Sequence, residues 1–244
     1  MSEKSSPAPL AVVTGAARRL GKAIARELAA RGYAIGLHYN SSTHEAGETA
    51  AELRAAGADV LLLQADLTDP AEVERLFKQI DGQLHPLRVL VNSAAVMPGG
   101  DLREMTVEEW DGIMALNLRA PWLCAQQAAR RMTEGGVIIN ISDSGAHKVW
   151  SRYPVYIISK NGLETLTRLL AKTLAPAIRV NGVAPGLILP KEDFPDEEWQ
   201  RLVDRLPLKQ AGSPEAVAQA VGFLVENAHI TGEIIVVDGG YQLV

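Results

Sequence analysis

Short apolar runs alternate with amphipathic segments along most of the chain. The first apolar run is Leu10–Thr14, and the segment after it, Leu20–Arg31, carries Leu20, Ile24 and Leu28 at helical spacing. The same unit recurs, and the further predicted strands are Ala34–Tyr39, Val60–Gln64, Arg88–Asn92, Val137–Ser142, Ile178–Ala184 and Ile234–Asp238. The further predicted helices span about 43–56, 70–81, 106–132 and 154–175. Strands that alternate with amphipathic helices favour a parallel sheet covered on both faces.

No change in composition divides the chain into separate domains. We therefore predict one α/β domain over residues 10–244, a doubly wound, parallel, seven-stranded sheet of Rossmann type, after a polar tail at residues 1–9. The longest interruption is 187–213, which carries three prolines and a charged cluster. Because strand and helix patterns resume after it, we interpret this segment as a lid over a site rather than as a linker between domains.

The composition is that of an ordinary globular protein, and it excludes several classes of function. The chain has 244 residues, a net charge of -5 and no run of Lys and Arg that would favour nucleic acid. Its single cysteine, Cys124, excludes an internal disulfide or a cysteine-based zinc site, and we expect it to be buried. No stretch reaches about 18 uninterrupted apolar residues, and residues 1–7 lack the apolar part of a secretory signal. We therefore expect a soluble, cytoplasmic protein with no membrane partner.

A turn of small residues, 14–21, joins the first predicted strand to the first predicted helix and contains Gly15 and Gly21. Small residues let the backbone approach a pyrophosphate, and a helix N-terminus offers it free N–H groups and a positive dipole end. Turns of small residues also occur for purely structural reasons. The position of this turn, between the first strand and the first helix, is the one that dinucleotide binding requires.

The end of the second predicted strand indicates which nicotinamide cofactor binds. Enzymes that use NAD place an Asp or Glu there, about 20 residues after the glycines, to bind the ribose 2′-hydroxyl. The corresponding stretch here has no carboxylate; a 2′-phosphate would meet the hydroxyls of Ser41 and Ser42 and the amide of Asn40. Arg18 or Arg19 would reach it from the turn, so we predict NADPH. The alternative is that the two serines cap the next helix, and both roles are compatible.

Tyr156 and Lys160 are four residues apart and therefore share one face of a predicted helix. A tyrosine with its usual pKa of about 10 is a poor acid at neutral pH. A nearby ammonium would stabilise the phenolate and lower that pKa, while its remaining donors bind a nicotinamide ribose. The pair alone is a weak motif, and its weight comes from the motifs that accompany it.

The chain resembles the short-chain dehydrogenase/reductase family over nearly its whole length. The matching residues are the turn at 14–21, Asp66-Leu67, Val91-Asn92-Ser93-Ala94, Asn117, Tyr156 with Lys160, Pro185-Gly186 and the closing stretches 231–232 and 237–240. The resemblance implies a nicotinamide-dependent oxidoreductase in which Asn117 shapes a helix and holds a water molecule for proton relay. It also implies a homotetramer, because the long helices of such proteins pack against symmetry mates.

The motifs and the resemblance together give the expected functional residues. The expected catalytic residues are Asp143, Tyr156, Lys160 and Asn117. The expected cofactor-binding residues are Gly15, Arg18, Arg19, Leu20, His38, Tyr39, Asn40, Ser41, Asp66, Leu67, Asn92, Ser93, Ala94, Tyr156, Lys160, Pro185, Gly186 and Ile188. The expected substrate-binding residues are Arg19, Met97, Asp143 and Tyr156. We expect no metal site, because no cluster of metal-ligating residues supports one.

Two departures from the common family pattern point to one branch. Arg19 stands where most members have a third glycine, and Asp143 stands where most have a catalytic serine, 13 residues before Tyr156. Both departures resemble the pteridine reductases, including bacterial dihydromonapterin-reductase-like members, whose acid group is an Asp-Tyr-Lys set. In this branch the substrate is a pterin, and Arg19 would meet its electronegative edge beside the cofactor phosphates.

The chemistry of Asp143 agrees with that resemblance. An aspartate beside a tyrosine in a nicotinamide cleft is partly desolvated, which raises its pKa and lets it hold a proton. Such a pair suits a ring-nitrogen acceptor: hydride goes to a ring carbon while Tyr156 and Asp143 protonate the adjacent nitrogen. The alternative is that Asp143 is an ordinary carboxylate at a strand end and that Ser142 or Ser144 performs the serine's role.

Other positions fit the pteridine reductases less well. The well-studied members stack the pterin on a phenylalanine, whereas Met97 occupies that place here, and Ala95 lacks a hydroxyl that would bind the cofactor or the pterin. Trp150 and Tyr153 either supply aromatic surface to the site or pack in the fold. His147 is a lone histidine in a polar stretch, and the sequence gives it no role.

Three functions therefore compete. The first is NADPH-dependent reduction of pterins or dihydropterins, and the second is NADPH-dependent reduction of a ketone, such as a 3-oxoacyl thioester, with a serine assisting Tyr156. The third is a cofactor-binding protein without turnover, such as a redox sensor. The presence of Tyr156, Lys160 and Asn117 argues against the third, which would be excluded if Tyr156→Phe abolished cofactor oxidation.

Overall fold

Seven parallel strands form one sheet in the computed structural model, which describes residues 7–191 and 194–244. Residues 1–6 of the predicted tail lie outside this description. The strands are β1 (Leu10–Val13), β2 (Ala34–Tyr39), β3 (Val60–Gln64), β4 (Leu87–Asn92), β5 (Gly136–Ile141), β6 (Ile178–Pro185) and β7 (Ile234–Val237). Their order is β3-β2-β1-β4-β5-β6-β7, and each neighbouring pair is parallel. The predicted single α/β domain with a doubly wound sheet is confirmed.

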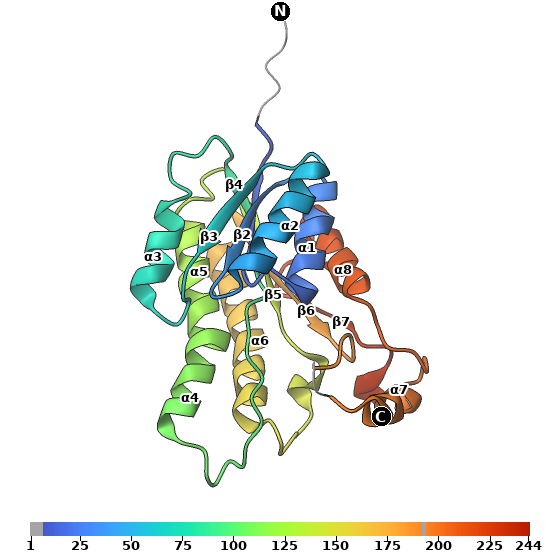
Figure 1. The fold of residues 1–244 in the computed structure, drawn as a ribbon. Helices are drawn as coiled ribbons and strands as arrows, with labels where there is room; N and C mark the ends of the chain where they lie inside the picture. The colour runs from blue at the N-terminus through green and yellow to red at the C-terminus, as the bar shows by residue number, and fades with distance from the viewer. Residues whose placement is uncertain (1–6, 192–193) are drawn as a thin grey trace, which may run out of the picture.

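Helices cover both faces of the sheet (Figure 1). They are α1 (Arg19–Ala30), α2 (Thr43–Ala55), α3 (Pro70–Lys78), α4 (Val107–Met114), α5 (Ala120–Ala129), α6 (Pro154–Leu174), α7 (Asp196–Arg205) and α8 (Pro214–Glu226). Side chains of α1, α2 and α8 pack on one face, whereas those of α3, α5 and α6 pack on the other. The residues of the inner strands are mostly buried, as the near-continuous apolar runs predict, whereas those of the edge strands β3 and β7 are mostly only partly buried.

Two predicted segments differ from the observed elements. The helix predicted over 106–132 is two α-helices joined by a π-helical turn, Ala115–Arg119, and it ends at Ala129. A π-turn is a short and rare interruption inside an α-helix, and the segments on both sides of it still read as helical, so the predicted helix runs through it. The predicted lid, 187–213, contains α7, and α8 follows it.

The order of the strands determines where a site can form. The chain leaves β1 toward β2 on one side and later returns to β4 on the other, so the connections diverge beside β1. In such sheets ligands bind outside the carboxyl ends of the strands at this point of divergence. The turn after β1, the loop after β4 and the segment after β5 all begin there.

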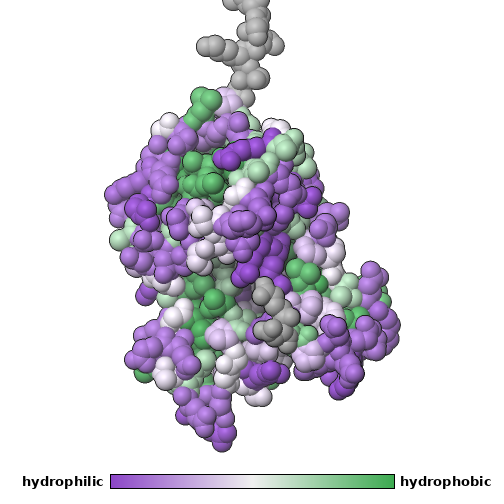
Figure 2. Space-filling model, viewed as in Figure 1, coloured by the Kyte–Doolittle hydropathy of each residue, from purple (hydrophilic) through white to green (hydrophobic). Residues whose placement is uncertain are grey.

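The surface in Figure 2 is hydrophilic over most of the visible face, with smaller hydrophobic areas between the charged residues. Among the described residues, none of the helices combines the length and the apolar character that crossing a membrane requires.

Candidate active site

The turn between β1 and α1 is held in a conformation that only small residues permit. Gly15 has a φ of 66°, and a methyl group added there would lie 3.0 Å from the Cα of Ala94. A methyl group on Gly21 would lie 2.1 Å from the carbonyl oxygen of Gly15, so α1 begins directly against the turn. Arg18, the N-cap of α1, makes no side-chain capping bond, and the first turn of α1 has no acidic residue. These features fit a helix N-terminus that receives a phosphate group.

Thr14 fastens this turn to the loop that follows β4. Its Oγ1 accepts hydrogen bonds from the backbone N–H groups of Ser93 (2.9 Å) and Ala94 (3.0 Å). The Asn92 side chain is buried and donates to the Oδ1 of Asn140 at 2.8 Å. The expected cofactor residues Asn92, Ser93 and Ala94 are therefore brought beside Gly15, with the Asn92 amide engaged in the core.

The His38 side chain binds the backbone of the turn between β1 and α1. Its Nδ1 accepts from the N–H of Gly15 at 3.0 Å, and its Nε2 lies 3.1 Å from the carbonyl oxygen of Ala65. These partners require a neutral ring with its proton on Nε2. Burial lowers the pKa of His38 to about 4, against the opposing effects of the Ala65 carbonyl and Asp66. Both ring nitrogens thus bind backbone groups, and His38 acts by fixing the glycine turn.

The end of β2 places the predicted 2′-phosphate residues at the surface beside the turn. Asn40 and Ser41 are exposed, and Tyr39 is half-buried. Ser42 is the N-cap of α2, yet its side chain makes no capping bond, so the structure does not support capping as its role. The Oδ1 of Asp66 accepts from the N–H and the hydroxyl of Thr68, at 2.9 and 2.7 Å. Leu67, the next expected cofactor residue, is buried.

Tyr156 and Asp143 meet at the end of β5. The Tyr156 hydroxyl donates to Oδ2 of Asp143 at 2.6 Å, and the N–H of Gly145 donates to Oδ1 at 2.7 Å. Burial raises the pKa of Asp143 above its usual range, although both of these hydrogen bonds oppose that rise. Burial, followed by the charge and hydrogen bond of Asp143, raises the pKa of Tyr156 well above 10. Both groups therefore retain protons more strongly than they do in water.

The neighbouring serines do not take the place of Asp143. The Ser142 hydroxyl donates to Oε1 of Glu164 at 3.0 Å, and the Ser144 hydroxyl is buried with no hydrogen-bond partner among the described residues. The acid partner of Tyr156 in this structure is the carboxylate, as the sequence predicts.

Lys160 lies one helical turn beyond Tyr156 on α6 and is buried. Its Nζ donates to the carbonyl oxygen of Ile141 at 2.7 Å and lies 5.7 Å from the centre of the Tyr156 ring. Burial lowers the pKa of Lys160 to about 8, and the charge of Asp143 partly opposes this. Burial and the adjacent carboxylate raise the pKa of Tyr156, and the lowering effect expected of Lys160 stays a prediction.

Asn117 lies in the π-helical turn and connects three parts of the site. Its side chain accepts from the N–H of Val96 at 3.0 Å and donates to the Val96 carbonyl at 2.9 Å. It also lies 3.1 Å from Oγ of Ser159, which in turn donates to the carbonyl of Tyr156 at 2.7 Å. π-Turns occur frequently at functional sites, where they direct one side chain out of the regular helical array.

Arg19 joins the cofactor turn to the start of the predicted lid. It has a φ of 51°, in the left-handed region, which explains why a glycine is common at this family position. Its Nη2 donates to the carbonyls of Pro190 (2.7 Å) and Leu189 (3.3 Å). Lys191 makes a similar link to the loop after β4, since its Nζ donates to the Met97 carbonyl at 2.8 Å.

A cavity of about 700 Å³ opens above Tyr156. All four predicted substrate residues line it, namely Arg19, Met97, Asp143 and Tyr156, together with Gly186, Ile188, Trp150 and Tyr153. The sequence analysis did not predict three further aromatic residues that line the cavity: Phe194, Trp199 and Tyr241. Trp199 and Phe194 belong to the predicted lid. Aromatic residues in such a charged stretch could have indicated that they line the site. Nothing in the local sequence pattern places the C-terminal Tyr241 here.

Expected cofactor residues after β6 reach the same cavity. Pro185 ends β6, and a methyl group on Gly186 would lie 2.5 Å from Cβ of Asp238, so the backbone passes close to β7 there. Leu20 is half-buried at the start of α1.

Cys124 lies in α5 and is fully buried, as the sequence predicts. This burial raises its pKa to about 12.

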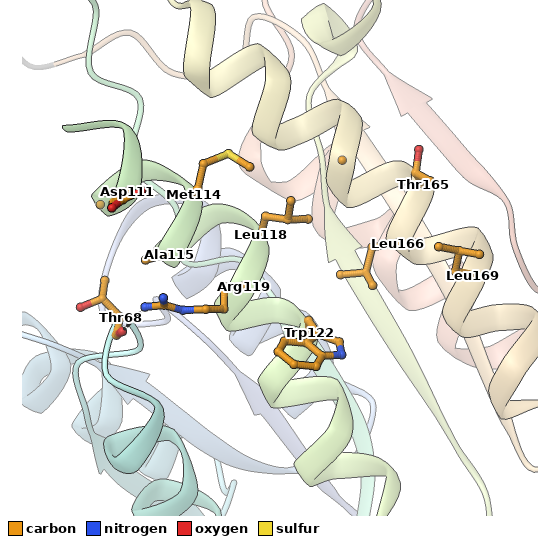
Figure 3. A pocket seen from close by; sticks show the side chains of 12 residues that line it. Thr68, Asp111, Met114, Ala115, Leu118, Arg119, Trp122, Thr165, Leu166 and Leu169 are labelled. Carbon is orange, nitrogen blue, oxygen red and sulfur yellow. Dashed lines mark hydrogen bonds between the residues drawn. The ribbon is translucent and has the colours of Figure 1, made fainter. Parts of the chain in front are cut away.

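A second groove, of about 860 Å³, lies away from these residues between α4, α5 and α6 (Figure 3). Leu118, Trp122, Leu166 and Leu169 line it, and Trp122 and Leu169 are exposed. Arg119 donates to the Thr68 carbonyl at 2.7 Å at one end. This groove contains none of the predicted site residues.

Known proteins resemble the chain throughout its length. The family model described as enoyl-(acyl carrier protein) reductase, a short-chain dehydrogenase model, matches residues 15–242. A putative ketoacyl reductase 2 of the granaticin polyketide synthase of Streptomyces violaceoruber is 35% identical, with 100% of each chain covered. The 3-oxoacyl-(acyl-carrier-protein) reductase FabG of Staphylococcus aureus is 34% identical, over 96% of this chain and 98% of the relative.

Among solved structures, FolM alternative dihydrofolate reductase 1 from Brucella canis, complexed with NADP, superposes with a TM-score of 0.91. It is 35% identical, over 98% of this chain and 95% of that one. The chain belongs to the short-chain dehydrogenase/reductase family, and its site is that of an NADP-dependent reductase of this family.

Proposed function

We propose that the protein is an NADPH-dependent reductase of pterins or dihydropterins. The observation that carries the proposal is the 2.6 Å hydrogen bond from the Tyr156 hydroxyl to Asp143, in a position where a serine is usual in the family. Arg19 and Met97 line the same cavity. The structural similarity to a FolM alternative dihydrofolate reductase supports the same conclusion.

The residues around the glycine turn would hold the cofactor. The N-terminus of α1 would receive the pyrophosphate, and the exposed Asn40 and Ser41, with Arg18, would receive the 2′-phosphate. Lys160 and Tyr156 would bind the nicotinamide ribose. NADPH supplies the hydride when bound.

The chain's own groups supply the proton. While a ring carbon accepts the hydride, the Tyr156 O–H bond breaks and its proton passes to the adjacent ring nitrogen. Burial raises the pKa of Asp143, so this group holds a proton more readily than in water; in its protonated form Asp143 then returns a proton to the Tyr156 oxygen, and solvent reprotonates the carboxylate. One hydride and one proton are thus added to one C=N bond.

Ketone reduction is the second candidate. The relatives from Streptomyces violaceoruber and Staphylococcus aureus are named as ketoacyl reductases, and Ala95 and Met97 depart from the pteridine reductase pattern. In that reaction Tyr156 would protonate the carbonyl oxygen. Against it stands Ser142, whose hydroxyl donates to Glu164 rather than to Tyr156.

A panel of substrates distinguishes the two candidates. NADPH oxidation is measured with dihydrobiopterin, dihydromonapterin, folate and an acetoacetyl thioester at equal concentrations. The proposal predicts the highest kcat/KM with a dihydropterin, and the same panel with NADH should give at least about a tenfold lower value. Absence of activity on every pterin, with turnover of the thioester, would establish the second candidate instead.

We also propose a cytoplasmic homotetramer. Exposed apolar residues of the groove in Figure 3, Trp122 and Leu169, lie on the helices expected to pack against symmetry mates. The single, fully buried Cys124 suits a reducing compartment. Light scattering that gives a monomer mass at working concentrations would refute the tetramer.

A further inference from the structure

A buried glutamate, Glu164, lies on the catalytic helix behind Asp143. Only 2% of its side chain is exposed. It is on α6, one helical turn beyond Lys160, and its Oε1 accepts from the Ser142 hydroxyl at 3.0 Å. Ser142 immediately precedes Asp143. A carboxylate this deeply buried is costly for the fold unless its charge is compensated.

Two basic side chains lie beside the second oxygen of Glu164, Oε2, which has no hydrogen-bond partner among the described residues. Nε2 of His147 lies 3.0 Å from Oε2 of Glu164, and Nη2 of Arg168 lies 3.7 Å from the same oxygen. His147 belongs to the short 3-10 helix Ser144–His147 that follows Asp143, and Arg168 lies one turn further along α6. Glu164 therefore connects the segment on both sides of Asp143 to the helix that bears Tyr156.

The charges that face Asp143 come from several elements. From α6, Tyr156 donates a hydrogen bond, the Lys160 ammonium lowers the pKa of Asp143, and the Glu164 carboxylate raises it. From the C-terminal segment, Tyr241 is close enough for Asp143 to raise its pKa. Burial is the largest cause of the raised pKa of Asp143, and Glu164 is the one like charge that reinforces it. In the described structure, Glu164 thus opposes the effect of Lys160 on the pKa of Asp143.

We infer that Glu164 is a positioning residue of the proton-donating site, which holds the Ser142–His147 segment against α6 and places its carboxylate behind Asp143. Arg168 moderates the like-charge repulsion between Glu164 and Asp143, because it neutralises part of the Glu164 charge. The inference rests on the proposed function, in which Asp143 supplies the proton. It gives His147, an isolated residue in the sequence, a partner and a role.

Direct titration of Asp143 tests the inference without a substrate. Infrared difference spectra of protein labelled with 13C-aspartate follow the carboxylic acid band, which Asp143→Asn identifies by removing it. Glu164→Gln keeps an oxygen to accept from Ser142 but removes the charge, so the Asp143 titration should move to lower pH. Arg168→Gln removes a compensating cation, so the titration should move to higher pH. Glu164→Asp keeps the charge and should lie nearer the wild type than Glu164→Gln.

Turnover gives a second measure. Because a lower pKa leaves less Asp143 protonated, Glu164→Gln should move the alkaline fall of kcat toward acid and reduce kcat at pH 7 about fivefold, with KM nearly unchanged. Glu74→Gln, in an exposed pair with Lys78 on α3, is the matched control and should move neither quantity. Urea unfolding of each variant verifies that the fold is retained.

The outcomes separate the inference from the proposed function. If Glu164→Gln and Glu74→Gln leave the Asp143 titration at the wild-type position, or if Arg168→Gln moves it in the same direction as Glu164→Gln, the inference is wrong. If Asp143→Asn retains wild-type kcat on its best substrate, the proposed role of Asp143 is wrong, whatever the titration shows.

Discussion

At the scale of single residues, the reacting end depends on buried ionisable groups whose pKa values move in different directions. Burial raises the pKa of Asp143 and of Tyr156, and it lowers that of Lys160 to about 8. Asp143 and Tyr156 therefore hold their protons more strongly than in water, whereas Lys160 loses its proton more readily than in water. Such separation of pKa values between neighbours is typical of acid–base sites.

His38 gives a testable pH dependence. Its pKa in the folded protein is about 4, below the ordinary 6.5 of an unfolded chain, so the unfolded state binds a proton more readily. Stability is therefore complete above pH 6.5 and falls as the pH drops toward 4. Between pH 7 and pH 5 this residue should cost about 2 kcal/mol of the free energy of unfolding. Urea unfolding at both pH values, with wild type and His38→Gln, measures that difference.

His38→Gln should lack this part of the loss of stability between pH 7 and pH 5, whereas His44→Gln, at an exposed site on α2, should retain it. Protonated His38 cannot accept from the Gly15 N–H, so affinity for NADPH should fall over the same range in the wild type. An equal loss of stability between the two pH values in wild type and His38→Gln would contradict the assignment.

Sequence reasoning identified the reacting residues but not the direction of every effect. Asp143 and Tyr156 were recognised from their spacing. The upward shift of the Tyr156 pKa was missed, because it follows from burial and from a 2.6 Å contact that a one-dimensional pattern does not contain. Glu164 and His147 were missed for the same reason, since they meet only when α6 packs against the segment after β5.

At the scale of elements, the approach of α1 to the turn after β1 decides whether the cofactor fits. Gly21→Ala would put a methyl group 2.1 Å from the Gly15 carbonyl oxygen, and backbone at that position cannot move aside cheaply. We predict that it raises the Kd for NADPH at least about tenfold and lowers stability by about 1–3 kcal/mol. Fluorescence titration with NADPH and urea unfolding check the two effects.

Gly47→Ala is the matched control. Gly47 lies in α2, and a methyl group there meets nothing within 4 Å, so the substitution should stabilise the helix by about 1 kcal/mol or less and leave NADPH affinity unchanged. Wild-type affinity in Gly21→Ala would show that the turn does not bind the cofactor.

Most elements follow from the hydrophobic pattern, and the exceptions have physical causes. All seven strands were predicted because they read as apolar runs, although only the inner strands are mostly buried and the edge strands β3 and β7 are partly exposed. The π-turn at Ala115–Arg119 was missed, since it is a single short turn between two segments that both read as helical. Helix α7 was not recognised inside 187–213, because its residues are mostly exposed and only Val203 is buried. The lid function of this segment stays a prediction.

At the scale of the whole molecule, the sheet order brings residues from the entire chain to one edge. Arg19, Met97, Asp143, Ile188 and Tyr241 come from well-separated parts of the sequence and line one cavity. The net charge of -5 gives no indication of anion binding, whereas Arg18 and Arg19 place positive charge beside the helix N-terminus. Local charge, not the total, therefore indicates where phosphates bind.

The central claim is that Asp143 and Tyr156 together protonate a pterin ring nitrogen. The most direct test compares kcat/KM for a dihydropterin with that for an acetoacetyl thioester, under saturating NADPH, in the wild type and in Asp143→Asn. We predict that the wild type prefers the dihydropterin and that the variant loses about 100-fold or more of kcat/KM on it while NADPH affinity is unchanged. Nearly intact dihydropterin reduction by Asp143→Asn would contradict the account.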